Sequence, residues 1–174
     1  AKEAGVAERV TFLEEDFFAV DLRKATVVAL YLLPELNVRL MPKFLSEMKP
    51  GARIVSHRWD MGKWKPDMTL KAYDTTVHLW FVPAQVGGSW RLSLRNEKGS
   101  REFNLAIKQN FQRIRATLSD GKRKYTIEDA VIQGTDIVIS VEDAVRGKIF
   151  VLKLEGEVKG DNIEGAAFIR EGDT

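Results

Sequence analysis

Few side chains of this sequence could carry out chemistry, and two that could, Tyr31 and His57, each follow an apolar run. If these runs are buried parallel strands, both residues lie beyond strand carboxyl ends, where sites form in α/β sheets. A tyrosine hydroxyl could orient a nucleophile there, and a histidine could act as a general base. Both also have structural interpretations. Tyr31-Leu32-Leu33-Pro34 could be a core strand stopped by proline, and a single histidine often serves only as a structural hydrogen-bonding residue.

The elements expected to position Tyr31 and His57 are a strand, a helix and a second strand within residues 26–57. The apolar run VVAL predicts the first strand, and the apolar spacing after Pro34 predicts a helix with one apolar stripe. Pro42 interrupts that spacing and should bend the helix or divide it in two. Gly51 ends the helix, and residues 52–57 predict the next strand. This order of elements is typical of half of a doubly wound α/β sheet.

Asp16 and Phe17 follow a shorter apolar run at residues 10–13, which predicts another strand. From its neighbours alone, Asp16 is a helix cap or a turn residue. Further upstream, residues 1–4 favour a helix, and Gly5 is a natural left-handed stop. A protein rarely begins at a helix end, and the first residue here is not methionine. We therefore expect that residues upstream have been lost, removed or left out.

From Trp90 onward the sequence alternates strictly between apolar and polar residues. Short alternating runs separated by turn signals, such as Gly134-Thr135 and Gly160-Asp161, predict an antiparallel sheet that curls into a roll or barrel. With a boundary at the Gly87-Gly88 pair, we expect a partial Rossmann-like domain at residues 1–86 and an antiparallel β domain at 87–174. Residues 58–73 predict a loop, a lid or site wall whose tryptophans could pack in the core or stack on a ligand.

Composition narrows the range of partners. The 174 residues are 44% hydrophobic, and 27 basic against 25 acidic residues leave a formal charge of +2. This balance argues against nucleic acid as a partner, although basic clusters at residues 108–115 and 122–124 could touch phosphates. The absence of cysteine excludes disulfides, and two histidines leave little material for a metal site, so none is expected. No apolar stretch approaches the ~20 residues of a membrane span, and we expect a soluble, cytoplasmic protein without a membrane partner.

Two stretches of the sequence are characteristic of a family. AGVAERVTFLEEDFF and ATVVALYLLPELNVRLMPKFLSEMKPGARIVSHRWDMGKWKPD closely resemble the second half of the catalytic domain in a bacterial group of class I S-adenosylmethionine-dependent methyltransferases, which has a YLLP motif. The resemblance implies that residues 10–13, 26–33 and 52–57 are the third, fourth and fifth strands of that fold. It covers roughly the first 85 residues, and the β-rich remainder resembles the extension that this group carries.

The resemblance also implies roles for individual residues. Asp16 resembles the acidic residue that accepts a hydrogen bond from the adenine amino group of S-adenosylmethionine, with Phe17 beside the ring. Tyr31, Leu32, Leu33 and Pro34 match the motif that borders the sulfonium and the incoming nucleophile, and His57 ends the next strand. The implied activity of the complete form is methyl transfer to a nitrogen nucleophile, such as a protein lysine or a small-molecule acceptor.

The sequence departs from the family on the donor side. The family's first strand, its glycine-rich loop and the acidic residue that binds the ribose are absent, and no Gly-x-Gly-x-x-Gly spacing occurs. We therefore expect that this chain alone lacks a complete S-adenosylmethionine site. The alternative function is a non-enzymatic β-rich module, derived from a truncated methyltransferase, that binds an apolar ligand or a partner. The sheet edge exposed by such a truncation could also support a homo-oligomer.

Overall fold

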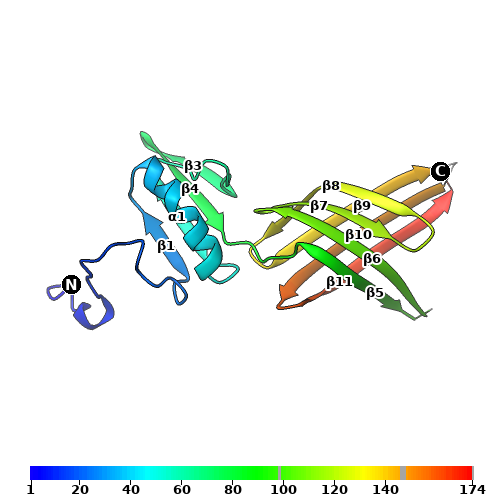
Figure 1. Ribbon diagram of the computed structural model, residues 1–174, viewed down its shortest axis with the longest axis horizontal. Helices are drawn as coiled ribbons and strands as arrows, with labels where there is room; N and C mark the ends of the chain where they lie inside the picture. Colours follow the sequence, from blue (N-terminus) through cyan, green and yellow to red (C-terminus); the bar gives the residue numbers. More distant parts are fainter. Residues whose placement is uncertain (98, 146–147, 174) are drawn as a thin grey trace.

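The computed structural model describes residues 1–97, 99–145 and 148–173 and contains two layers of regular structure (Figure 1). A small mixed sheet with one helix comes first, and a larger antiparallel sheet that curls into a barrel-like shape follows it. The predicted fold class, a partial Rossmann-like sheet followed by an antiparallel roll or barrel, is confirmed. The exact boundary between residues 86 and 87 stays a prediction.

The first sheet contains four strands in the order β1-β2-β4-β3. Strands β1 (Val27–Leu30) and β2 (Arg53–His57) pair in parallel, as two strands joined by a helix should. Strand β4 (Thr75–Phe81) returns antiparallel to both β2 and β3 (Met68–Ala72), so it lies inside the sheet. Strand β3 falls within the predicted loop at residues 58–73, and that part of the prediction is wrong.

Helix α1 (Pro34–Glu47) connects β1 to β2 and packs one apolar stripe, with Leu40 and Phe44, against the sheet. Pro34 occupies the first turn, where its missing N–H costs nothing. The predicted division at Pro42 is wrong, because the helix is continuous through it. Pro42 removes only one helical hydrogen bond, and the packed stripe on both sides of it holds the helix together.

The segment before β1 contains one short 3-10 helix, η1 (Ala7–Arg9), and is otherwise irregular. The predicted strand at residues 10–13 is wrong: no described strand pairs with it, and the Phe12 side chain is 83% exposed. Its physical reason is the sheet order, because β1 is an edge strand and no described neighbour lies beyond it. The predicted helix-end turn at Gly5 is confirmed. Gly5 has a φ of 65° and donates to the Lys2 carbonyl, in the pattern of a helix C-terminus.

The second sheet contains seven strands in sequential order, each antiparallel to the next. Alternate residues face inward, and they form a core that is separate from that of the first sheet. The turns at Gly134 and Gly160 are both two-residue hairpin connections with φ near 60°, which glycine adopts without strain. The strands are β5 (Gly88–Asn96), β6 (Gly99–Asn110), β7 (Arg113–Ser119), β8 (Lys124–Gln133), β9 (Asp136–Val145), β10 (Lys148–Lys159) and β11 (Asn162–Asp173).

The turn between β6 and β7 joins the two sheets. Phe111 stacks on Trp64 of the first sheet's core, with ring centroids 6.0 Å apart and an interplanar angle of 16°. The Gln112 amide donates to the Lys65 carbonyl at 2.6 Å. Gln109 fixes the linker, because its amide nitrogen donates to the Ala84 and Phe111 carbonyls, both at 2.8 Å. The two sheets therefore share side-chain packing and hydrogen bonds.

Candidate functional site

Tyr31 and His57 lie side by side at one edge of the first sheet. Leu30 and Ser56 are register partners in the parallel β1–β2 pair, so the residues that follow them emerge at the same carboxyl edge. Their ring centroids are 4.8 Å apart with a tilt of 35°, and the Tyr31 side chain is 82% exposed. An accessible phenol hydroxyl next to an imidazole is an arrangement that can orient a nucleophile and accept a proton.

The His57 ring is held from the neighbouring strand. Its Nε2 atom lies 3.1 Å from Thr75 Oγ1, at the start of β4. The chain then turns sharply at Arg58, a non-glycine residue with a φ of 68°, where the Trp59 N–H donates to the His57 carbonyl at 2.9 Å. Such a backbone conformation costs about 1–3 kcal/mol and is concentrated at functional sites. The imidazole is therefore fixed by a side chain on one side and by a strained turn on the other.

The remaining residues of the YLLP motif form a rigid turn into helix α1. Leu32 packs against the core of the first sheet, whereas Leu33 is exposed. The Leu33 carbonyl accepts hydrogen bonds from the Leu36 and Asn37 N–H groups at 3.1 and 3.2 Å, so the helix already uses it. Pro34 follows in the first helical turn. The Tyr31 hydroxyl is thus the polar side-chain group that the motif offers to a substrate.

Asn37 was not predicted as part of this site. Its side chain is 0% exposed, and its Nδ2 atom donates to Ser56 Oγ at 2.9 Å and to the Trp59 carbonyl at 3.1 Å. Because Ser56 precedes His57 and Trp59 follows the strained turn, Asn37 connects the helix after YLLP to the segment that carries His57. A signal was present in the sequence, since this polar residue lies on the apolar stripe of the helix, three positions before Leu40.

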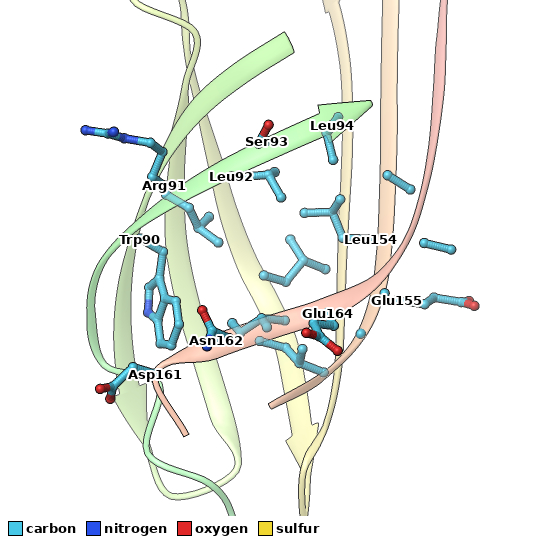
Figure 2. Close-up of a pocket in the computed structure, with 18 residues that line it drawn as sticks. Trp90, Arg91, Leu92, Ser93, Leu94, Leu154, Glu155, Asp161, Asn162 and Glu164 are labelled. Carbon is cyan, nitrogen blue, oxygen red and sulfur yellow. The ribbon is translucent and has the colours of Figure 1, made fainter. Parts of the chain in front are cut away.

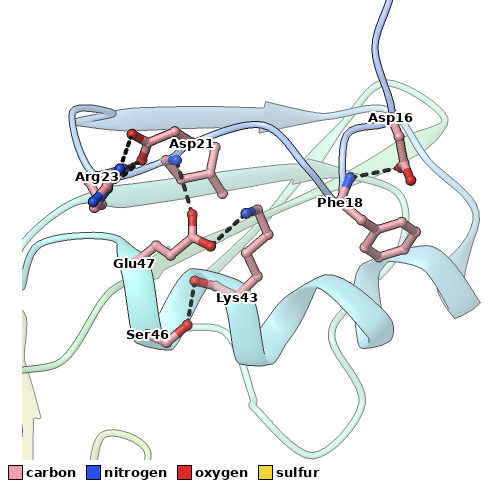
Figure 3. Close-up of polar contacts among 8 residues, drawn as sticks. Asp16, Phe18, Asp21, Arg23, Lys43, Ser46 and Glu47 are labelled. Carbon is pink, nitrogen blue, oxygen red and sulfur yellow. Dashed lines mark hydrogen bonds and ion pairs between the residues drawn. The ribbon is translucent and has the colours of Figure 1, made fainter.

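Asp16 and Phe17 lie on the irregular segment before β1 (Figure 3). The Asp16 carboxylate accepts the Phe18 N–H at 3.0 Å, and its carbonyl accepts the Ala19 N–H at 2.7 Å, which is the geometry of a turn residue. Phe18, 4.5 Å from the half-exposed Phe17, packs under the Arg39 guanidinium of helix α1. Figure 3 shows Asp16 and Phe18 near the end of α1 away from Glu47, the end nearer Tyr31 in sequence.

A second polar group in the same region has a structural role (Figure 3). Glu47, the last residue of α1, accepts hydrogen bonds from Lys43 at 2.6 Å and from the Leu22 N–H at 3.1 Å. The hydrogen bond from the Lys43 ammonium, followed by that from Leu22, lowers the pKa of the Glu47 carboxyl below its ordinary value. These bonds fasten the segment before β1 to the helix.

The side chains present fit S-adenosylmethionine only in part. Asp16 uses one carboxylate oxygen in its turn, which leaves Oδ2 for an amino group, and Tyr31 borders the position where transfer would occur. The 174 residues contain no glycine-rich loop for the methionine end of the donor. Within the described ranges, no three His, Asp or Glu residues are grouped to hold a metal ion, and no helix is long and apolar enough to cross a membrane.

Comparison with known proteins agrees with the placement of this site in the first sheet. Residues 1–68 match the family model of the ANTKMT methyltransferase domain. The chain is 39% identical over 82 residues to a protein-lysine N-methyltransferase of Saccharolobus islandicus (strain REY15A), over 45% of this chain and 51% of that protein. It is 29% identical over 91 residues to an ATP synthase lysine N-methyltransferase of Mus musculus, over 52% of this chain and 37% of that protein.

Among solved structures, the chain is similar to an RNA methyltransferase from Salinibacter ruber in complex with S-adenosyl-L-homocysteine. The two are 46% identical, with a TM-score of 0.47 over 49% of this chain and 56% of that one. The matched region spans about half or less of the two curated lysine methyltransferases. Residues 1–68 thus match a methyltransferase domain, as the resemblance predicted.

Proposed function

We propose, from the match of residues 1–68 to the ANTKMT methyltransferase domain, that this chain carries the acceptor side of an S-adenosylmethionine-dependent N-methyltransferase. The observation that carries the proposal is the contact between Tyr31 and His57 at the carboxyl edge of the β1–β2 pair. The acceptor we propose is a protein lysine, because both curated relatives are named as lysine N-methyltransferases.

Methyl transfer from a sulfonium depends mainly on holding the nucleophile in line with the methyl carbon. In the proposal, the exposed Tyr31 hydroxyl accepts a hydrogen bond from the lysine amine and so directs its lone pair. His57 supports the phenol ring at 4.8 Å and can take the proton that the amine must lose. Thr75 and Asn37 are positioning residues, because they hold His57 and its strand without reaching the exposed face.

The test measures transfer of labelled methyl groups from S-adenosylmethionine to poly-L-lysine by the purified chain at saturating donor. We expect weak donor binding, because the glycine-rich loop is not among these residues, together with measurable transfer. Tyr31→Phe should lower transfer about tenfold or more, since it removes an orienting hydrogen bond. If the unsubstituted chain transfers no methyl group, the enzymatic proposal for these residues is wrong.

The chain offers a matched control for the tyrosine substitution. Tyr73 is also fully exposed, at 107%, but lies in the β3–β4 turn rather than beside His57. Tyr73→Phe removes the same hydroxyl from another part of the same sheet and should leave transfer unchanged. Equal losses in the two variants would show that Tyr31 has no special role.

The second candidate function is the non-enzymatic β-rich module. It is favoured by a specific observation, a cavity of about 430 Å³ at the open side of the second sheet. This function predicts ligand or partner binding that is independent of S-adenosylmethionine. We also propose a cytoplasmic location and association through the free edge of β1. Association through this edge predicts a molecular mass in solution that rises with protein concentration.

A further inference from the structure

The two edge strands of the second sheet leave the barrel open. Seven strands pair successively and antiparallel from β5 to β11, so the first and the last run in the same direction. No pairing joins β5 to β11 in the described part of the chain. Each edge strand therefore has backbone N–H and C=O groups that point into the opening at every second residue. A single added strand, antiparallel to both edges, would satisfy both rows and close the barrel.

The opening is a groove with the length of a strand (Figure 2). Its first part, about 430 Å³, is lined by consecutive residues 90–94 of β5 and by residues 161–167 in and before β11. A second hollow of about 630 Å³ continues it along residues 93–96 and 165–169. A cavity inside the barrel would be lined only by alternate, inward-facing residues. Consecutive residues on both sides show that the strand edges themselves face this groove.

The core of the barrel is incomplete along the same groove. Inward-facing residues of the interior strands, such as Leu118 and Ile132, are fully buried. Those that face the groove are only partly buried although they pack against the same core: Trp90, Leu92, Leu94, Leu154, Ile163 and Ile169. Figure 2 shows Leu92 and Leu94 directed across the opening toward Leu154. Alternate apolar side chains of an added strand would cover these residues.

The charge beside the groove is positive on the β5 side. Arg91 and Arg95 are exposed on the outer face of β5, and their register partners on β6 are the uncharged Asn104 and Ser100. No salt bridge of the described residues involves either arginine. Across the groove on β11, Glu164 is already paired with Lys159 at 3.0 Å. An added strand with carboxylates on its outer face would place them beside the two arginines.

We propose that this groove binds an extended peptide segment, in which apolar residues alternate with acidic ones, as an eighth strand antiparallel to β5 and β11. The groove follows nine residues of β11, from 161 to 169, which corresponds to a segment of about seven to nine residues. Its apolar residues point into the barrel, and its acidic residues point toward Arg91 and Arg95. This site is independent of the methyl-transfer proposal.

The first test uses a capped nine-residue peptide of alternating valine and glutamate. Trp90 lines the groove and is the single tryptophan in residues 87–174, so its emission should shift to shorter wavelength as the peptide covers it. We expect saturable binding that weakens at least about tenfold when the central residue is proline, which cannot donate to a strand ladder. Equal binding of the proline peptide or of a scrambled peptide would overturn strand addition in favour of a nonspecific apolar site.

The second test reverses the charge beside the groove. Arg91→Glu/Arg95→Glu should weaken binding of the valine–glutamate peptide about tenfold or more, and should strengthen binding of a valine–lysine peptide. Arg123→Glu, an equally exposed change in the β7–β8 turn, is the control and should affect neither peptide. Absence of binding by the unsubstituted chain overturns the proposal. A mass that doubles with concentration and falls in the double variant would identify a second copy of the chain as the occupant instead.

Discussion

Asn37 allows a quantitative test of how the candidate site is held together. Replacing it with alanine removes two hydrogen bonds, to Ser56 Oγ and to the Trp59 carbonyl, each worth about 1 kcal/mol net. The vacated volume in a fully buried position adds about 1 kcal/mol. Asn37 Oδ1, which is buried without a partner among the described residues, is lost as well and returns about 1 kcal/mol. The expected loss of unfolding free energy is therefore about 2 kcal/mol.

Urea unfolding followed by tryptophan emission measures this loss, because Trp59, Trp64 and Trp80 all lie in the first sheet and its connecting loops. With a slope of about 2 kcal/mol per molar urea, the midpoint should fall by about 1 M. In a double-mutant cycle, Asn37→Ala and Ser56→Ala should couple by about 1 kcal/mol. Asn104→Ala, on the exposed outer face of β6, should change stability by less than about 0.5 kcal/mol. A midpoint for Asn37→Ala that matches this control would refute the role assigned to Asn37.

Two further substitutions test the electrostatics of the first sheet and the curvature of the second. Burial raises the pKa of the Asp67 carboxyl, against the lowering effect of the Phe81 N–H that it accepts at 2.8 Å, so its contribution to stability falls as pH rises from the unfolded-state value of about 3.9 through the higher folded-state value. Asp67→Asn keeps the acceptor and should raise Tm at pH 7 but not at pH 3, and an equal effect at both values would contradict this cause. Gly165→Ala would place a methyl group against the Glu155 carbonyl and 2.5 Å from Gly156 Cα, and should destabilise the barrel by about 2 kcal/mol or more. Gly172→Ala on the same strand has open space and should be nearly neutral in the same thermal unfolding assay.

The parts of the fold that were predicted correctly are those with a strong hydrophobic period. Strands β1 and β2 and helix α1 have apolar runs or stripes that packing then satisfies. Residues 10–13 have a similar apolar run, but a strand also requires a partner, and the sheet provides none beside them. Strand β3 has the opposite property. It is mostly exposed and becomes a strand because β4 pairs with it. Strand β7 was interpreted only as part of a basic cluster, although Ile114, Ala116 and Leu118 alternate within it and face the core.

The same limits apply to the candidate site. Tyr31 and His57 could be placed together from the sequence, because adjacent parallel strands bring their carboxyl ends to one edge. Thr75 could not be placed there, since the register of an antiparallel return strand is not visible in the sequence. The contact of Asn37 with the segment around His57 depends on the crossing of helix and sheet, which hydrophobic period alone does not determine.

The stacking of Phe111 on Trp64 has a consequence for the order in which the protein acquires its structure. Trp64 is fully buried in the first core, yet one of the rings that packs on it comes from the β6–β7 turn of the second sheet. Ala84 and Val86, which lead out of the first sheet, are in turn buried in the core of the second. During synthesis the N-terminal residues leave the ribosome first, but their core stays unfinished until the β6–β7 hairpin has emerged. The last stage in consolidating the first sheet therefore waits for residues that are translated after it.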